Sequence, residues 1–237
     1  MSDQISVFDP LAGSIAWLSG PHTSRPIAML NADAAIEDAA LLQCLAPAEA
    51  MAANGMTVEQ ERRHFVRRRV FQRSFVRAIT GWPGPLNTLT MVQQQDCRPS
   101  CVEAPAHCLS FSSSGAVALA CASASALIGV DIERLRPVPD AIGLARRFFT
   151  AAEAGYLGSL PLDQKDPEFQ RFWSAKEACL KAAGQGAIYG LDQFAIIRTA
   201  TGLSVAPPAE FGPAQRWSLE TIPAPQGYIA MLAQFRL

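Results

Sequence analysis

The chain has no long apolar run and no basic N-terminal leader. No run reaches the roughly 18 consecutive apolar residues that a membrane-spanning helix needs. The N-terminus, Met1-Ser2-Asp3-Gln4, lacks the positive charge with which a secretory signal begins. We therefore expect a cytoplasmic protein without a membrane partner.

A large net charge is also absent. The 237 residues carry 20 Lys and Arg against 21 Asp and Glu, so the formal net charge is −1. This balance argues against a nucleic-acid or membrane-surface binder that relies on bulk attraction, and any charge-driven binding must be local. Apolar residues make up 49% of the chain, which suits a sizeable core in one large domain or in two halves.

The cysteines form neither a disulfide framework nor a clear zinc pattern. A chain of this size needs no disulfides to fold, and its six cysteines are scattered, as free thiols in a reducing compartment are. C-x3-C is an uncommon zinc spacing, and adjacent residues of a strand point apart. We therefore do not expect zinc at the closest group, which is Cys97, Cys101, His107 and Cys108.

Capping residues and an apolar period of 3.6 residues predict helices. Thr150-Ala151-Ala152-Glu153 has the form of a capping box, and Asp166 followed by Pro167 is a typical helix start. The glycines and prolines of residues 81–85 mark a loop. The predicted helices cover residues 33–45, 58–79, 140–149, a stretch from 150 onward, and 166–184.

Short β-rich segments predict strands between these helices, so the order of elements is mixed α+β. The strands at 108–112, 117–122 and 126–133 are closely spaced and suggest an antiparallel meander, whose first turn is Ser113-Ser114-Gly115. The remaining predicted strands cover residues 27–30, 194–197, 217–219 and 228–235.

Two acidic residues share one face of the predicted strand 126–133. Asp131 and Glu133 are two positions apart and point the same way in an extended strand, whereas Ile128, Val130 and Ile132 take the other face. Such a pair is either a divalent-metal site or the solvent-facing side of an edge strand. The apolar flanks and the spacing favour a metal site.

The predicted helix 166–184 carries a second pair of charged residues. Glu177 and Lys181 lie one turn apart on one face, where they form either an ordinary salt bridge or part of a site. Trp173 lies on the same stripe, so these charges sit beside a large aromatic side chain. Together with Asp131 and Glu133 they suggest metal-assisted phosphoryl chemistry. Glu153 is explained equally well by its capping box.

Arginines line one stripe of the predicted helix 58–79, and Arg63, Arg67 and Arg68 add to the charge. This stripe can be a solvated face, a nucleic-acid contact or a polyphosphate site, since arginine binds phosphate bidentately. The residues by themselves leave these three alternatives open. The stripe consists of Arg62, Arg69, Arg73 and Arg77.

Several motifs together resemble the 4'-phosphopantetheinyl transferases of the Sfp type. They are Gly129-Val130-Asp131-Ile132-Glu133, Arg147-Phe148-Phe149 with Glu153, and Phe172-Trp173-Ser174-Ala175-Lys176-Glu177-Ala178 with Lys181. Looser counterparts of the family's elements are residues 62–73, Cys97-Arg98-Pro99, Ser112-Ser113-Ser114 and Gly184-Gln185-Gly186.

The resemblance implies an α+β fold of two similar halves related by a pseudo-twofold axis, with the active site at their junction. Residues 1–124 would form the half on the side of the coenzyme A nucleotide, and residues 125–237 the half with the metal and the catalytic helix. The family transfers 4'-phosphopantetheine from coenzyme A to a serine of an acyl or peptidyl carrier protein and uses Mg²⁺. A monomer serving fatty-acid, polyketide or nonribosomal-peptide synthesis is therefore expected.

The resemblance also implies roles for individual residues. Asp131, Glu133 and Glu177 would hold the metal, and Glu177 and Lys181 would be the catalytic residues. Either Glu177 or a water on the metal would take the proton of the carrier serine. The residues expected to bind coenzyme A are Arg62, Arg63, Arg69, Arg73, Arg98, Ser112, Ser113, Lys176 and Lys181.

Two positions depart from the family pattern. Ser113 stands where the family usually has histidine, and Gln185 stands where it has lysine, so each position lacks a cation near phosphate. The rival interpretations are a non-catalytic relative that binds coenzyme A or a carrier protein, and a nucleic-acid binder. Retention of the three acids and Lys181 favours the transferase, and the near-neutral charge disfavours nucleic acid.

Overall fold

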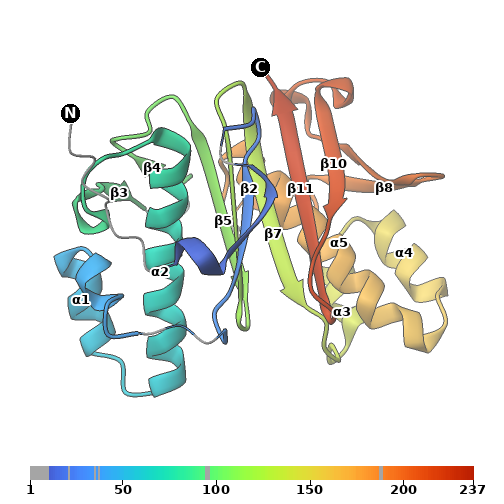
Figure 1. Ribbon diagram of the computed structural model, residues 1–237. Coiled ribbons are helices and arrows are strands. Elements are labelled where there is room, and N and C mark those ends of the chain that lie inside the picture. The colour runs from blue at the N-terminus through green and yellow to red at the C-terminus, as the bar shows by residue number, and fades with distance from the viewer. Residues whose placement is uncertain (1–10, 21, 35, 37, 94–96, 187–188) are drawn as a thin grey trace.

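The computed structural model describes residues 11–20, 22–34, 36, 38–93, 97–186 and 189–237. Two antiparallel sheets pack face to face, and each has a long helix on its outer side (Figure 1). The α+β class is confirmed. Within the described residues no helix has both the length and the apolar character required to cross a bilayer.

The first half of the chain forms a four-stranded sheet with the strand order β1-β2-β6-β5, together with the small pair β3-β4. Helix α2 covers this sheet. The elements are β1 (Ile15–Ser19), β2 (Ile27–Asn31), α1 (Pro47–Asn54), α2 (Glu59–Thr80), β3 (Met91–Val92), β4 (Ser100–Cys101), β5 (Cys108–Ser114) and β6 (Val117–Ser123), with short 3-10 turns at Ala12–Ser14, Leu42–Cys44 and Leu86–Thr88.

The second half forms a three-stranded sheet with the order β10-β11-β7 and the separate pair β8-β9. Helix α5 packs on the three-stranded sheet. The elements are β7 (Ala126–Arg134), α3 (Ala141–Phe148), α4 (Ala151–Ser159), α5 (Leu162–Ala183), β8 (Ala195–Thr199), β9 (Gly202–Ala206), β10 (Trp217–Ile222) and β11 (Tyr228–Arg236), with 3-10 turns at Ala209–Phe211 and Ala214–Arg216.

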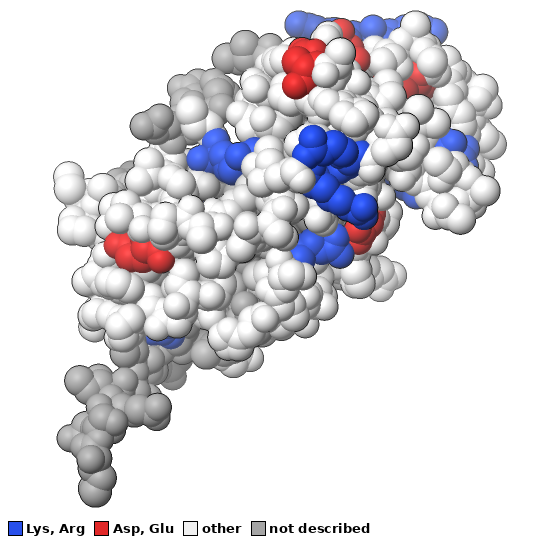
Figure 2. All heavy atoms as spheres, turned by 90° about the horizontal axis from the view of Figure 1, so that it is seen from above, with Lys and Arg blue, Asp and Glu red and all other residues white. Residues whose placement is uncertain are grey.

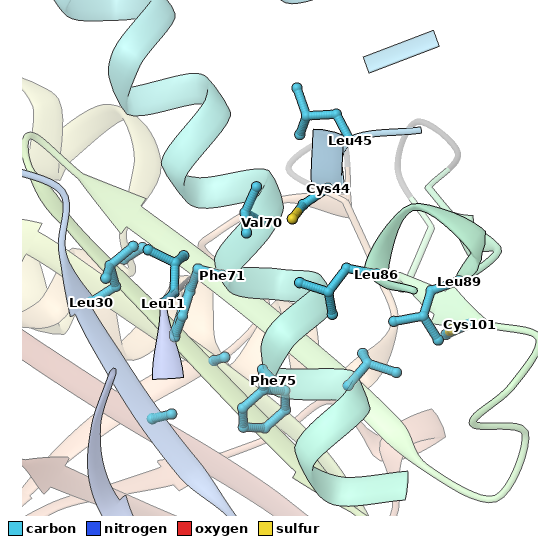
Figure 3. Close-up of a cluster of buried hydrophobic side chains, with 14 of the residues drawn as sticks. Leu11, Leu30, Cys44, Leu45, Val70, Phe71, Phe75, Leu86, Leu89 and Cys101 are labelled. Atoms are coloured by element: carbon cyan, nitrogen blue, oxygen red, sulfur yellow. The ribbon is translucent and has the colours of Figure 1, made fainter. Parts of the chain in front are cut away.

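The alternation of side chains along the strands divides the apolar core into three layers. Alternate residues of β2 and β6, such as Leu30 and Ala120, face α2, where Phe71 and Phe75 fill the first layer (Figure 3). The opposite faces of the two sheets contact each other in a middle layer. This middle layer is formed chiefly by Ile27, Met29, Leu119, Ile128, Val130, Ile132 and Leu232. In the third layer the apolar stripe of α5 packs on β11. Helix, sheet, sheet and helix are therefore stacked in that order.

Side chains of β5 contact one edge of β7. Successive N–H groups of a strand point to opposite edges, so alternate residues of β7 present one row of donors. Four residues of β5, also alternate, accept these hydrogen bonds. The contacts are Ile128 N to Cys108 Sγ at 3.3 Å, Val130 N to Ser110 Oγ at 3.0 Å, Ile132 N to Ser112 Oγ at 3.3 Å and Arg134 N to Ser114 Oγ at 3.1 Å. We call this row of contacts the seam.

Helix α5 lies unusually close to β7 at Gly129. A Cβ atom added there would lie 2.0 Å from the Ala178 carbonyl oxygen and 2.4 Å from the Ala182 nitrogen. The helix backbone therefore rests directly on the strand. Because Gly129 and Asp131 share one face of β7, the same contact holds the last two turns of α5 above Asp131.

Most predicted elements are confirmed, including the strands at 27–30, 108–112, 117–122 and 126–133 and the helix at 58–79. Residues 33–45 do not form the predicted helix: in their described part only Leu42–Cys44 is helical, as a 3-10 turn, and residues 35 and 37 lie outside the described residues. Arg67 donates hydrogen bonds to the carbonyl oxygens of Ala32, Ala34 and Ile36, which a helix would use itself. Pro47, which follows this segment, is the first residue of α1, as its fixed φ allows.

Two further expectations are corrected. Helix α5 begins at Leu162 instead of Asp166, and Pro167 lies inside it, where proline removes a single main-chain bond near the helix start. The meander stops after β6, because β2 and β5 already occupy both edges of β6 and β7 pairs with β11 instead. The first turn is also shorter than predicted, since β5 continues through Ser114. A twofold relation between the halves, and their boundary at residue 124, stay predictions.

Replacing Gly129 with alanine should strongly destabilise the protein. The new methyl group would overlap main-chain atoms of α5 that cannot turn away, so we expect the free energy of unfolding to fall by about 3 kcal/mol or more. Urea unfolding measures the loss. Gly155→Ala is the matched control, because Gly155 lies in α4 with open space around it. The free energy of unfolding of this variant should rise by up to about 1 kcal/mol. Equal stability of Gly129→Ala and the unmutated chain would contradict the close contact.

Candidate functional site

A cavity of about 540 Å³ opens where α2, β5, β7 and α5 meet. Three acids and a lysine that the sequence predicted to act together all line it: Asp131 and Glu133 from β7, and Glu177 and Lys181 from α5. Residues of the first half complete the wall. They include Phe65, Arg68, Arg69, Gln72, Ser112 and Ser113.

Asp131 is the most buried acid of the cavity, with 4% of its surface exposed. Its Oδ1 atom accepts hydrogen bonds from Lys181 Nζ at 2.7 Å and from Ser112 Oγ at 2.8 Å. Within the described residues its buried Oδ2 atom has no hydrogen-bond partner. A buried carboxylate oxygen without a partner is costly, and a cation or a donor from a ligand would satisfy it.

The other two acids are half-buried and affect each other. Burial raises the pKa of Glu133 and the charge of Asp131 raises it further, whereas the Ser114 hydrogen bond and Lys181 lower it. Burial also raises the pKa of Glu177, where the charge of Lys181 opposes the shift and Asp131 and Glu133 add to it. The single ammonium of Lys181 thus does not fully compensate the three carboxylates.

This donor set fits a hard divalent cation. Mg²⁺ prefers oxygen ligands and is usually bound by one or two carboxylates together with water and substrate oxygens. The unpartnered Asp131 Oδ2 supplies one such oxygen. In the described residues no three His, Cys, Asp or Glu side chains are already arranged around one ion position, so substrate and water would have to complete the coordination.

On the first half of the chain, α2 presents a different set of arginines from the predicted one. Arg69 lines the cavity as expected and is held by Gln93 at 2.9 Å and Gln72 at 3.1 Å. Its neighbour Arg68, which was not among the predicted binding residues, also lines the cavity and donates to Ser113 Oγ at 3.3 Å. Burial and the charge of Arg69 lower the pKa of Arg68.

Three of the residues predicted to bind coenzyme A do not line this cavity, and their role stays a prediction: Arg62, Arg63 and Arg73. Arg62 and Arg63 line a separate cavity of about 150 Å³, where they pair with Glu59 and Asp38. Arg73 is only 2% exposed and donates to the carbonyl oxygens of residues 86 and 89. Arg62 and Arg73 are about 16 Å apart along the helix axis, since each residue rises about 1.5 Å. The arginines of one helical stripe therefore lie in three environments: Arg62 in the small cavity, Arg69 in the large one and Arg73 in the protein interior.

Lys176, which was also predicted to bind coenzyme A, lies in the core of the second half. Its side chain is fully buried, and Nζ lies 2.8 Å from Glu153 and donates to the carbonyl oxygens of Leu191 and Phe194. Burial lowers the pKa of Lys176, and the charge of Glu153 opposes this shift. Glu153 additionally accepts hydrogen bonds from the main chain of Thr150 and Ile196. This buried ion pair therefore links α4 and α5 to residues 191–196.

Arg98 lies near Glu177 and Lys181 but lines a different cavity. A second cavity of about 190 Å³ is lined by Arg98, Glu177, Lys181 and residues 184–186. Arg98 Nη2 donates to the Ala182 carbonyl oxygen at 2.7 Å, and its buried Nε lacks a partner in the described residues. Gly184 allows this approach by ending α5 in the left-handed region, with φ of 73°.

Two residues at the cavity were not among the predicted site residues, namely Arg68 and Ser114. Arg68 had a usable signal, since Phe65, Arg68, Arg69 and Gln72 follow the helical spacing of one face. Ser114 bonds Glu133 Oε2 at 2.9 Å and had no signal beyond its place in a serine run. On the face shown in Figure 2, most atoms belong to uncharged residues, and basic side chains gather near the middle and along the upper edge.

Parts of the chain are similar to known proteins of one family. Residues 127–232 match the model of the 4'-phosphopantetheinyl transferase superfamily. The chain is 45% identical over 97 residues to the 4'-phosphopantetheinyl transferase HetI of Nostoc, covering 40% of this chain and 38% of that protein. It is 36% identical over 76 residues to the 4'-phosphopantetheinyl transferase Sfp of Bacillus subtilis, covering 32% of this chain and 33% of that protein. The matches thus span less than half the length of these relatives.

Removing one acid of the cavity should stabilise the protein at neutral pH. Because the pKa of Glu133 is raised in the folded state, the folded protein binds this proton more tightly than the unfolded chain. Stability is therefore lost as the pH rises from the ordinary glutamate pKa through the raised one. Glu133→Gln keeps the shape without the charge, so we expect its Tm to exceed that of the unmutated chain by a few degrees at pH 8.

The same comparison at pH 4 should show a smaller difference, since Glu133 is then mostly protonated. Calorimetry at the two pH values measures it. Glu61→Gln is the control, because Glu61 lies exposed in the first turn of α2 and should give no gain. A Tm of Glu133→Gln below that of the unmutated chain at pH 8 would show that the acid is well compensated.

Proposed function

We propose that this chain, whose residues 127–232 match the model of the 4'-phosphopantetheinyl transferase superfamily, transfers the 4'-phosphopantetheine group of coenzyme A to a serine of an acyl or peptidyl carrier protein, with Mg²⁺. The observation that carries the proposal is the meeting of Asp131, Glu133, Glu177 and Lys181 in one cavity. Two elements far apart in the sequence supply them, and the arginines of the same cavity come from a third. These charges match a substrate that contains a diphosphate.

In the proposed reaction the serine Oγ forms a bond to the β-phosphorus of coenzyme A, and the bond from that phosphorus to the bridging diphosphate oxygen breaks. The leaving group is 3',5'-ADP, and the serine proton goes to a base. Such a transfer depends on neutralising charge and holding the nucleophile in line. Asp131, Glu133 and Glu177 would hold the Mg²⁺ ion, which supplies positive charge to the diphosphate when bound.

Lys181 and Glu177 take the two catalytic roles in this proposal. The Lys181 side chain is 29% exposed and lines the cavity, so its ammonium can bind a phosphate oxygen and stabilise the leaving group. Glu177 would accept the serine proton, directly or through a water, because its carboxylate lines the same cavity as Lys181. The two side chains lie one turn apart, so the same helix positions both.

Coenzyme A would lie across the junction of the two halves. Arg68 and Arg69 line the same cavity as the acids and would bind phosphate oxygens, and Ser113 would donate a hydrogen bond. Ser112 already donates its proton to Asp131. Arg98, with its unpartnered Nε, would bind the 3'-phosphate on the side of the second cavity.

The carrier protein would dock at an apolar cavity of about 370 Å³ that adjoins the acids. This cavity shares Glu133 and Trp173 with the first one, and Val138, Leu144 and Phe148 line it. An amphipathic helix commonly inserts apolar side chains into such a groove. The exposed Arg136 at its border suits an acidic partner.

Transfer should depend on Asp131. Intact-mass spectrometry of an apo carrier protein, incubated with the chain, coenzyme A and Mg²⁺, should show the added mass of phosphopantetheine. Asp131→Asn should slow transfer by about 100-fold or more, because a preorganised charge near the diphosphate is lost. Asp163→Asn, in the first turn of α5, is the control that should react normally. No mass increase on carriers of all three pathways, with coenzyme A still bound, would instead identify a non-catalytic relative.

Restoring the missing cation at Ser113 should speed the reaction. Ser113 is exposed, lines the cavity and accepts a hydrogen bond from Arg68, so an imidazolium there can reach a phosphate. A charge-assisted hydrogen bond is roughly twice as strong as a neutral one. We expect Ser113→His to raise kcat/KM severalfold and the neutral control Ser113→Asn to leave it nearly unchanged. A fall in Ser113→His would show that serine is the better residue in this cavity.

A further inference from the structure

Ser114 makes two hydrogen bonds that connect the seam to the acids. Its hydroxyl accepts a hydrogen bond from Arg134 N at 3.1 Å and bonds Glu133 Oε2 at 2.9 Å. A hydroxyl has one proton to donate, so with the N–H as donor the proton of Ser114 points at the carboxylate. The main chain of β7 thus fixes the rotation of the very group that holds Glu133.

Glu133 needs such a support more than its neighbour does. Asp131 has a short side chain whose Oδ1 is held by both Lys181 and Ser112. Glu133 has one more rotatable bond, and in the described part of the chain Ser114 is the hydrogen-bond partner of its carboxylate. Without the Ser114 hydroxyl, the carboxylate of Glu133 would sample several positions in a cavity of about 540 Å³.

A second serine of the seam, Ser110, allows an effect on the position of Glu133 to be distinguished from an effect on the stability of the fold. Ser110 lies four residues before Ser114 on the same face of β5 and accepts the Val130 N–H at 3.0 Å. Ser110 is only 2% exposed, and its partner N–H is buried, so losing its hydroxyl damages the seam at least as much as losing that of Ser114. No carboxylate is among the hydrogen-bond partners that the structure describes for Ser110.

We propose that Ser114 is a positioning residue that holds the Glu133 carboxylate in place for a divalent cation. The first half of the chain thereby preorganises a cation site whose carboxylates all come from the second half. Removing a group that orients a metal ligand typically weakens metal binding by 10- to 100-fold. The identity of the cation as the partner of coenzyme A rests on the proposed function, but binding of the cation can be measured by itself.

Electron paramagnetic resonance of Mn²⁺ tests the proposal, because free Mn²⁺ gives a signal that bound Mn²⁺ largely loses. We would titrate the unmutated chain, Ser114→Ala, Ser110→Ala and Ser114→Thr with Mn²⁺, each with and without coenzyme A. Ser114→Ala should bind Mn²⁺ about tenfold more weakly. Ser110→Ala should keep the affinity of the unmutated chain while losing thermal stability, and Ser114→Thr, which retains the hydroxyl, should restore binding.

Three outcomes would overturn the proposal. They are unchanged Mn²⁺ affinity in Ser114→Ala, an equal loss of affinity in Ser110→Ala, and no Mn²⁺ binding by the unmutated chain with or without coenzyme A. The proposed function fails differently. If no carrier protein is modified while Mn²⁺ affinity still falls in Ser114→Ala alone, the positioning role stands and the transferase does not.

Discussion

The seam between β5 and β7 is the interaction on which the site depends. Strand β7 has one edge paired with β11, and side-chain acceptors of β5 satisfy N–H groups of its other edge. A free edge would leave these donors without partners inside the protein. Because hydroxyl groups accept the hydrogen bonds, the oxygens of Ser112 and Ser114 keep a proton to give to Asp131 and Glu133. One row of contacts therefore joins the halves and orients two acids.

The second constraint is the close packing of α5 on β7 at Gly129. Main-chain contact between a helix and a strand leaves no room for a side chain, and it brings residues 177 and 181 within reach of the strand's acids. Concentrating three half-buried or buried carboxylates in this way costs stability, as the raised pKa values of Glu133 and Glu177 indicate. The middle apolar layer between the sheets, with residues such as Ile128 and Val130 fully buried, offsets that cost.

The acids and the arginines differ in how far their positions could be read from the sequence. Asp131 and Glu133 were predicted correctly to share a face, because a strand fixes its side-chain directions with a period of two. Glu177 and Lys181 followed from the spacing of one helical turn. The helix that carries the arginines was also predicted correctly. Their spacing along it did not reveal that Arg73 is buried against main-chain carbonyls whereas Arg68 lines the cavity. Burial depends on what packs against a helix.

By itself, the sequence determined the type and order of most elements, the face on which each acid lies, and the resemblance to a family. These properties depend on local stereochemistry and on motifs that are short in the sequence. Only the tertiary structure decided that β7 leaves the expected meander, that Lys176 and Glu153 form a buried ion pair, and that Ser114 holds Glu133. Each of these depends on contacts between residues distant in the chain, which close packing of the layers selects and local spacing does not encode.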